Sequence, residues 1–188
     1  MRIPFKCDSV KLTSPYAVRT LDGTTAMHTG YDIVGIGSTA VTAVCSGRVV
    51  RSRIVTDKAN PTWQWGNYVC IKTDNGQYHY YCHLASRSVS EGQNVKRGDV
   101  LGVMGSTGYS FGAHLHFEVR SSDGKTTLSP ETVLGIPNAA GKYTLSQLEK
   151  DIFTLYSAGV INTPEFWEQN AAKFRYVPEL ISSMAQRV

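Results

Sequence analysis

The two turn sequences TDNGQ and SSDGK constrain the fold most, because Asn-Gly and Asp-Gly pairs favour the tight turns of β-hairpins. Each turn borders segments rich in Val, Ile, Tyr and Phe, which are frequent in strands. Similar segments recur up to about residue 135, and no helical periodicity interrupts them. We therefore expect residues 1–138 to form a mainly antiparallel β domain, as a sandwich or an open barrel.

The pattern changes after Gly141, where apolar residues recur at intervals of three and four, as in an amphipathic helix. Thr144 or Ser146 can cap the start of this helix, and Gly159 can end it. The leading apolar positions are Leu145, Leu148, Ile152, Leu155 and Tyr156. The spacing therefore predicts a helix across this segment.

Two further short helices follow in the sequence. The first is predicted to start at Asn162 or Thr163 with Pro164 in its first turn, and the second lies in VPELISSMAQRV. Residues 139–188 are thus expected to form a small all-α C-terminal appendage. So short a segment buries a low fraction of its surface. Its helices must therefore pack on one another and on the β domain, or dock a second subunit or a virion protein.

Composition excludes several classes of protein. The net charge is +4, but no basic run with interleaved aromatic residues indicates a nucleic-acid partner. The charge fits an anionic polymer such as a bacterial wall, and it fits mere solubility equally well. No apolar run approaches the ~20 residues of a membrane-spanning helix. The start, MRIPFKCDSV, lacks the apolar region of a secretory signal, so the usual export route is not expected.

The four cysteines, Cys7, Cys45, Cys70 and Cys82, contain no CxxC pair, which argues against a zinc knuckle. Three of them lie in apolar, strand-like segments. We therefore expect free thiols, with a disulfide pair as the alternative.

The histidines indicate a metal site. His114 and His116 are two apart, so in a strand they project from the same face. An HxH pair by itself also fits two half-buried, hydrogen-bonded histidines. His28 and Asp32, four apart around Gly30, add an imidazole and a carboxylate, a combination that suits Zn²⁺.

His79 and His83 bring the total to five histidines, more than one zinc ion takes. If their segment is a regular strand, the two share a face. A catalytic zinc site uses three protein ligands, so surplus histidines would serve as general acid–base or oxyanion-stabilising groups. The HExxH motif of helical zinc proteases is absent.

These motifs together resemble the lysostaphin/LytM-type zinc endopeptidases, which cut peptide cross-links in bacterial peptidoglycan. That family carries HxxxD, a later His-Leu pair and a terminal HxH, which here read HTGYD, YCHLA and GAHLHFE in the same order. Gly-rich connectors such as VSEGQNVKRGDVLGVMGSTGYSFG match as well. The resemblance covers about residues 10–135.

The resemblance implies a role for each histidine but one. His28, Asp32 and His116 match the ligands of one zinc ion. His114 matches the catalytic histidine beside the metal, and His83 matches its partner. His79 matches no functional position and is interpreted as structural or surface. Glu118 is interpreted as a carboxylate that orients an imidazole.

The sequence also departs from the family pattern. Ala17 stands where the family usually has Gly, and Cys82 precedes His83 where a small residue is usual. The insert TDKANPTWQWG is longer and more aromatic than expected. Trp63 and Trp65 either contact substrate at the groove rim or pack within their own loop.

The function implied is zinc-dependent hydrolysis of peptidoglycan peptides at the bacterial cell wall. The helical tail resembles a small module at the ends of phage- and prophage-type wall hydrolases, which suggests release through a holin or transport on a virion. Two rival functions remain. The protein could be a catalytically silent relative that binds peptidoglycan or activates another hydrolase, or a structural phage component that uses the fold as a scaffold.

Overall fold

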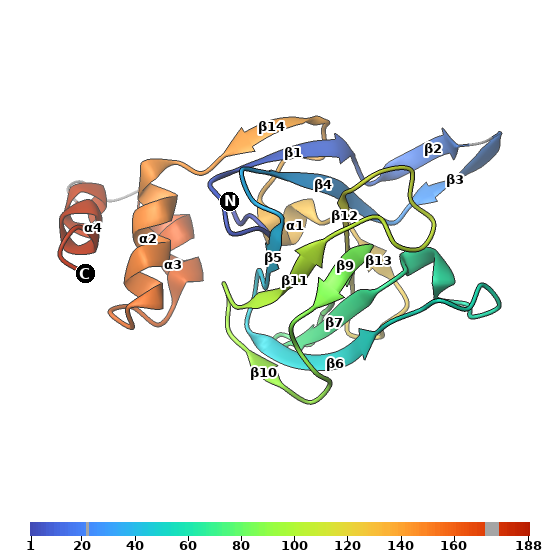
Figure 1. Ribbon diagram of the computed structural model, residues 1–188. Coiled ribbons are helices and arrows are strands. Elements are labelled where there is room, and N and C mark those ends of the chain that lie inside the picture. Colours follow the sequence, from blue (N-terminus) through green and yellow to red (C-terminus); the bar gives the residue numbers. More distant parts are fainter. Residues whose placement is uncertain (22, 172–176) are drawn as a thin grey trace. The chain divides into compact units, whose positions relative to one another are not determined.

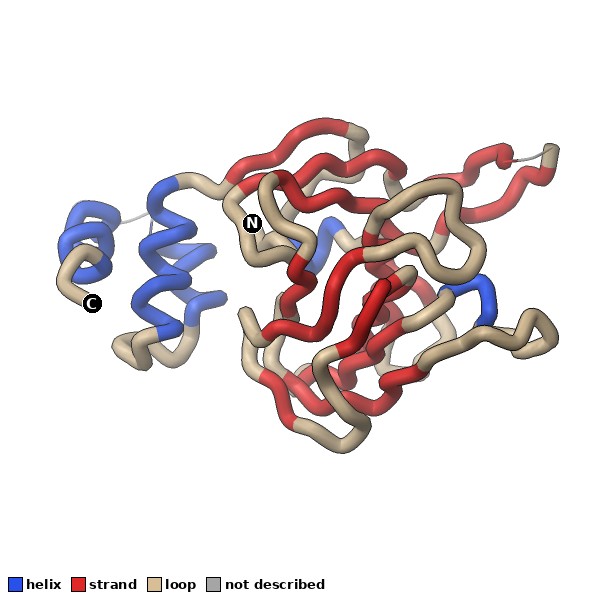
Figure 2. Tube along the Cα trace, in the orientation of Figure 1, coloured by secondary structure: helices blue, strands red, loops and turns tan. Residues whose placement is uncertain are grey.

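Antiparallel hairpins build most of the chain. The computed structural model describes residues 1–21, 23–171 and 177–188. It divides into two compact units, residues 2–143 and residues 144–188 together with Met1. The first unit is made of strands joined by loops and single helical turns, and the second contains the longer helices (Figures 1 and 2). The predicted fold class, mainly antiparallel β with a small helical part, is confirmed.

Nine strands in the described part of the chain form the main sheet, in the order β10-β6-β7-β8-β12-β4-β1-β14, with β13 paired to β12. Their bounds are β1 (Ser9–Ser14), β4 (Gly30–Ile36), β6 (Gly47–Arg53), β7 (Tyr68–Thr73), β8 (Tyr78–Cys82), β10 (Asn94–Val95), β12 (Leu115–Arg120), β13 (Thr127–Leu128) and β14 (Gly141–Thr144). The pairings from β10 to β1 are antiparallel. Strand β14 lies beyond residue 138 and still belongs to this sheet, beside β1 (Figure 1).

Two smaller sheets accompany the main one. The first contains β5 (Ala40–Thr42), β11 (Val100–Met104) and β9 (Leu84–Arg87), and the second is the hairpin of β2 (Ala17–Leu21) and β3 (Thr24–His28). Only one residue, His83, separates β8 in the main sheet from β9 in the three-stranded sheet. The chain therefore changes sheets at this histidine.

Two single helical turns, which the sequence did not predict, interrupt the strands. They are η1 (Trp63–Trp65) in the aromatic insert and α1 (Glu131–Leu134). Central strand β12 is buried on both faces from Leu115 to Val119, although its sequence, LHFEVR, alternates between apolar and polar residues. The polar residues His116 and Glu118 in this strand are therefore buried inside the domain.

The second unit contains the three predicted helices, α2 (Gln147–Ser157), α3 (Pro164–Asn170) and α4 (Val177–Ala185). Ser146, rather than Thr144, caps α2 in a reciprocal capping box with Glu149. Thr163 precedes Pro164 at the start of α3. The helices pack on one another through the buried side chains of Ile152, Leu155, Ala171 and Ile181. Among the described residues, no helix has the length and apolar character needed to cross a lipid bilayer.

All four cysteines are free thiols, as the sequence predicted. Cys70 and Cys82 are fully buried in one cluster with Tyr68 and Val55, whereas Cys7 and Cys45 are half-buried. Burial raises the pKa of Cys70 to about 12, so this thiol is an inert packing group.

His79 lies apart from the other histidines. It pairs with Val119 in the register of β8 and β12, is 1% exposed, and places its ring against the edge of Phe117 at 5.6 Å between centroids. His83 has φ 62°, so the run from His79 to His83 is not a regular strand, and the condition under which the two would share a face is not met. The structural interpretation of His79 agrees with its burial.

Burial of His79 predicts loss of stability in acid. Burial, with a smaller contribution from the charge of Arg2, lowers the pKa of His79 to about 3. The unfolded chain therefore binds this proton first, and stability falls as the pH drops below about 6.5. Between pH 7 and pH 5, the free energy of unfolding of the metal-free protein should fall by about 2 kcal/mol more than that of His79→Leu. Urea unfolding at both pH values measures this difference, and equal losses in the two proteins would contradict it.

Candidate metal and catalytic centre

Three buried side chains from three strands converge in the first unit. His28 ends β3, Asp32 lies in β4 and His116 lies in β12, directly opposite Asp32 in the strand register. Gly30 makes room for the imidazole of His116, since a Cβ at this position would lie 2.8 Å from Cε1 of that ring and 2.5 Å from the carbonyl oxygen of Phe117. A larger residue at Gly30 of HTGYD would therefore clash with the site.

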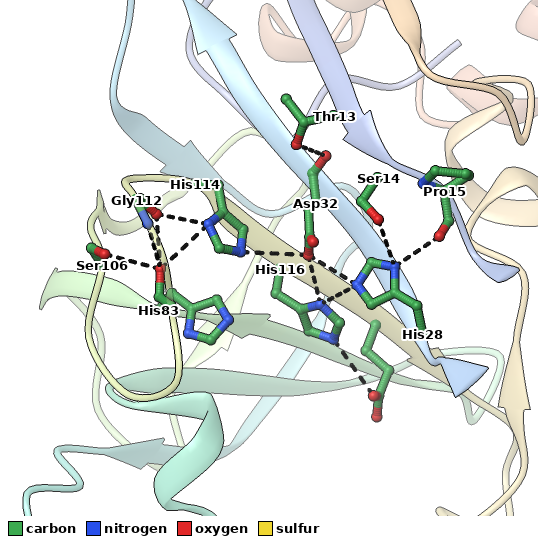
Figure 3. Close-up of polar contacts among 12 residues, drawn as sticks. Thr13, Ser14, Pro15, His28, Asp32, His83, Ser106, Gly112, His114 and His116 are labelled. Atoms are coloured by element: carbon green, nitrogen blue, oxygen red, sulfur yellow. Dashed lines mark hydrogen bonds and ion pairs between the residues drawn. The ribbon is translucent and has the colours of Figure 1, made fainter. Parts of the chain in front are cut away.

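The donor atoms of these side chains face a common point. Nε2 of His28 and Nδ1 of His116 each lie 3.0 Å from Oδ1 of Asp32, and the two nitrogens are 3.1 Å apart. Figure 3 shows the three side chains turned toward one another. The structure thus brings together the three residues that the resemblance assigned to the metal, and their ligand atoms all lie within 4.8 Å of one another.

The second nitrogen of each imidazole has its own partner. Nδ1 of His28 donates to the carbonyl oxygen of Pro15 at 2.7 Å. Nε2 of His116 faces Oε2 of Glu118 at 3.7 Å. These contacts fix the orientation of each ring, so that its opposite nitrogen faces Asp32.

Glu118 is itself held in place. It is 1% exposed, accepts a hydrogen bond from the Thr29 hydroxyl, and accepts another from Nε of Arg120 at 2.5 Å. Arg120 in turn lies over the rings of Trp65 and Tyr80, with its guanidinium carbon 5.1 and 4.9 Å from their centroids. Glu118 is therefore placed to orient the imidazole of His116, in agreement with its interpretation from the sequence.

The electrostatics of the cluster favour a bound cation. Burial would lower the pKa of His116, but its hydrogen bonds with Asp32 and Glu118 outweigh burial and raise this pKa to about 9. Burial likewise would raise the pKa of Asp32, yet its hydrogen bonds with His114, His116 and His28 bring it well below its usual range. The site therefore holds an ionised carboxylate among imidazole nitrogens and attracts positive charge.

The donor set fits zinc. Two imidazole nitrogens and one carboxylate oxygen are ligands of the type and number that catalytic zinc takes, leaving a fourth position open. Without a cation or a shared proton, the lone pairs of His28 and His116 would repel each other at 3.1 Å.

Arg19 also contacts Asp32, which the sequence did not predict. Its Nη1 donates to Oδ2 of Asp32 at 3.0 Å and to the hydroxyl of Ser14 at 2.7 Å. The guanidinium thus occupies one carboxylate oxygen and leaves Oδ1 for the histidines. No sequence signal indicates this contact, because it joins two separate sheets, the β2–β3 hairpin and the main sheet that contains β4.

His114 and His83 lie next to the three ligand residues. Nδ1 of His114 donates to the carbonyl oxygen of Gly112 at 2.8 Å, and its Nε2 lies 3.5 Å from Oδ1 of Asp32. Nδ1 of His83 donates to the carbonyl oxygen of Thr107 at 2.7 Å. The ring centroids of the two histidines are 4.7 Å apart. Burial, reinforced by the charges of His116 and His114, lowers the pKa of His83 to about 4, so this ring is neutral at pH 7.

The five side chains border a groove of about 740 Å³. One wall is the β2–β3 hairpin, with Leu21 and Met27, and the other contains the exposed rings of Tyr109 and Phe111. Trp65 lines the groove and also packs on Tyr68 and Tyr80. Trp63 packs on the same aromatic cluster. The two tryptophans of the insert therefore pack on side chains of β7 and β8 rather than within their own loop. Of the two, Trp65 alone is among the described residues that line the groove.

Comparison with known proteins gives one family. The sequence model of peptidase family M23 matches residues 26–130. The chain is 38% identical over 112 residues to the DD-carboxypeptidase/endopeptidase Mpg of Neisseria meningitidis, with 58% of this chain and 24% of Mpg covered. It is 33% identical over 129 residues to lysostaphin of Staphylococcus simulans, with 63% and 24% covered. The murein hydrolase activator NlpD of Escherichia coli is 33% identical over 108 residues, with 57% and 27% covered.

Solved structures agree with this match. The catalytic domain of lysostaphin from Staphylococcus simulans superposes with a TM-score of 0.54 at 30% identity, covering 65% of this chain and 90% of that domain. The catalytic domain of the prophage-encoded M23 protein EnpA from Enterococcus faecalis gives 0.54 at 28% identity, with 70% and 92% covered. The chain therefore spans about a quarter of the full-length relatives and nearly all of these two catalytic domains.

Proposed function

Because the chain belongs to peptidase family M23, we propose that it is a zinc metalloendopeptidase that hydrolyses peptide cross-links of bacterial peptidoglycan. The observation that carries the proposal is the convergence of His28, Asp32 and His116 on one point, with two further histidines beside them. The relatives support the substrate, since ShyC of Vibrio cholerae is a peptidoglycan DD-endopeptidase, 33% identical over 105 residues. The site of action would be the bacterial cell wall.

His28, Asp32 and His116 would hold one zinc ion, which would supply Lewis-acid polarisation of the scissile carbonyl and make water more acidic. His83 is neutral at pH 7 and has one nitrogen committed to Thr107, so its other nitrogen can accept a proton. His114 is committed at Nδ1 in the same way, which leaves its Nε2 on the groove side beside Asp32. We assign these two histidines to proton transfer and to stabilisation of the developing oxyanion.

The rival function is that of a silent relative, since NlpD activates murein hydrolases. The complete set of five polar side chains around the groove favours an enzyme instead, because binding alone requires none of the proton-accepting nitrogens. Digestion of purified peptidoglycan with the full chain, followed by mass spectrometry of the products, tests the proposal. We expect new free amino and carboxyl ends to form. Their formation should stop when a zinc chelator is present and resume when zinc is added. An intact muropeptide profile would contradict enzymatic activity.

We also propose a phage or prophage origin, supported by the resemblance of the helical tail to modules of such hydrolases and by the similarity to prophage-encoded EnpA. Export would then use a holin or a virion. The apolar side chains of Phe166 and Leu180 are 51% and 57% exposed in the helical unit. We propose that they dock a second copy of the chain or a virion protein.

Substitution of both exposed side chains tests this docking. Phe166→Ser combined with Leu180→Ser should lower the molar mass of a self-associating protein to that of the monomer, with no change in peptide hydrolysis. Light scattering after size exclusion, over a series of concentrations, measures the mass. A wild-type protein that is monomeric throughout would rule out self-association and leave the virion contact.

A further inference from the structure

The strand register alone does not bring His83 to the metal-binding face. Residues directly opposite each other in an antiparallel pair share a face of the sheet. Cys82 is opposite His116, and Tyr80 is opposite Glu118, so the even-numbered residues of β8 share the face of the site. His79 and Tyr81 occupy the other face, and His83 would follow them if β8 continued.

A left-handed backbone conformation at His83 places its side chain on the side of the site instead. Its φ of 62° is unique among the described non-glycine residues. This conformation turns the chain from β8 into β9 and brings the imidazole beside His114. A residue with a side chain adopts this conformation only at an energetic cost, so surrounding contacts must hold it there.

We propose that Thr107 is the positioning residue that holds His83 in its reactive orientation, an inference that rests on the proposed function of this site. The carbonyl oxygen of Thr107 accepts the Nδ1 proton of His83 at 2.7 Å. The neutral ring is thereby fixed in the Nδ1–H form, and Nε2 is the nitrogen left to accept a proton.

The hydroxyl of Thr107 fixes its carbonyl group in turn. Oγ1 donates to the carbonyl oxygen of Leu84 at 2.8 Å, and it accepts from the backbone N–H of Asn67 at 3.0 Å. Leu84 directly follows His83, and its own N–H donates to the carbonyl oxygen of Asn67 at 2.9 Å. The hydroxyl therefore ties Thr107 to Leu84, which directly follows the left-handed residue, and to Asn67, which is hydrogen-bonded to Leu84.

Close backbone packing completes the clamp. Gly66 lies against Thr107, where a Cβ on Gly66 would overlap its carbonyl group. The carbonyl oxygen of Trp65, one residue earlier, accepts a hydrogen bond from the backbone N–H of His83 at 2.8 Å. The same short segment therefore contacts both Thr107 and His83, so a shift of Thr107 would be transmitted to the imidazole.

Two variants of the zinc-loaded full chain test the proposal. Thr107→Val keeps the shape of the side chain and removes the hydroxyl, whereas Thr107→Ser keeps the hydroxyl and removes the methyl group. We expect Thr107→Val to lower kcat roughly 10-fold or more with little change in KM, because small misplacements of a catalytic group have effects of that size or larger. Thr107→Ser should stay within about 3-fold of wild type, and both should retain zinc.

The tautomer of His83 gives a readout independent of activity. Imidazole ¹⁵N chemical shifts should show one Nδ1–H form in the wild type and Thr107→Ser, and a mixture in Thr107→Val. If Thr107→Val keeps both the Nδ1–H form of His83 and the wild-type kcat, the proposal is overturned. It is also overturned if Thr107→Ser loses the single Nδ1–H form and has a strongly reduced kcat. The second outcome decides the matter even if Thr107→Val fails to fold. If the wild type hydrolyses no wall peptide, the proposed function fails, while the ¹⁵N shifts still decide whether Thr107 positions His83.

Discussion

Asp32→Ala is expected to lose most of its zinc and with it the hydrolysis of peptidoglycan. The substitution removes Oδ1, the atom that faces both His28 and His116 at 3.0 Å. It also leaves the positive charge of Arg19 without its carboxylate partner, next to the place where the cation would bind. Two imidazoles are fewer ligands than a catalytic zinc site uses.

Elemental analysis should find about one equivalent of zinc in the wild type and a small fraction of that in Asp32→Ala. Hydrolysis should fall by roughly 10³-fold or more, since Lewis-acid stabilisation of the transition state is worth several kcal/mol. Asp74→Ala, in an exposed turn, is the matched control and should keep both metal and activity. Full metal retention in Asp32→Ala would reject the ligand assignment.

His83→Ala and His114→Ala should separate turnover from metal binding. Neither side chain belongs to the set of three converging ligand atoms, so both variants should bind zinc as the wild type does. Loss of a general acid–base group typically reduces the rate by ~10²–10⁴-fold, and we expect a loss in that range for each variant. Steady-state hydrolysis of a purified cross-linked muropeptide measures it, with zinc content determined on the same samples.

The chain supplies a matched histidine control for these variants. His79→Gln replaces a buried histidine on the opposite face of β8 and should leave turnover unchanged. Near wild-type rates in His83→Ala or His114→Ala would contradict the assignment of that residue to catalysis. Reduced zinc content in either variant would place that histidine among the ligands instead.

Local sequence signals predicted the parts of this structure that depend on neighbouring residues. The Asn-Gly turn between β7 and β8 and the capped start of α2 at Ser146 follow from the residues in contact there. The HxxxD and HxH spacings likewise identified residues that the structure brings together, because each pair lies within one short segment. The family resemblance supplied their order along the chain.

Other features depend on contacts between distant segments. His83 reaches the site through a left-handed turn that only its neighbours Trp65 and Thr107 make tolerable. Arg19 lies in the separate β2–β3 hairpin and meets Asp32 of β4 only in the folded chain. Strand β14 exists because β1 offers it an edge, although its own sequence, GKYT, is too short to signal a strand. Patterns within a segment contain no information about these partners.

The opposition of Asp32 and His116 in adjacent strands limits how this sequence can change in length over evolution. Because side chains alternate between faces, one residue inserted into β12 between His116 and Glu118 would send Glu118 to the opposite face, away from His116. The same insertion in the turn that follows Ser121 would leave both groups in place. Homologues should therefore vary in length in the loops of this sheet and remain constant between Leu115 and Arg120, whatever substitutions accumulate there.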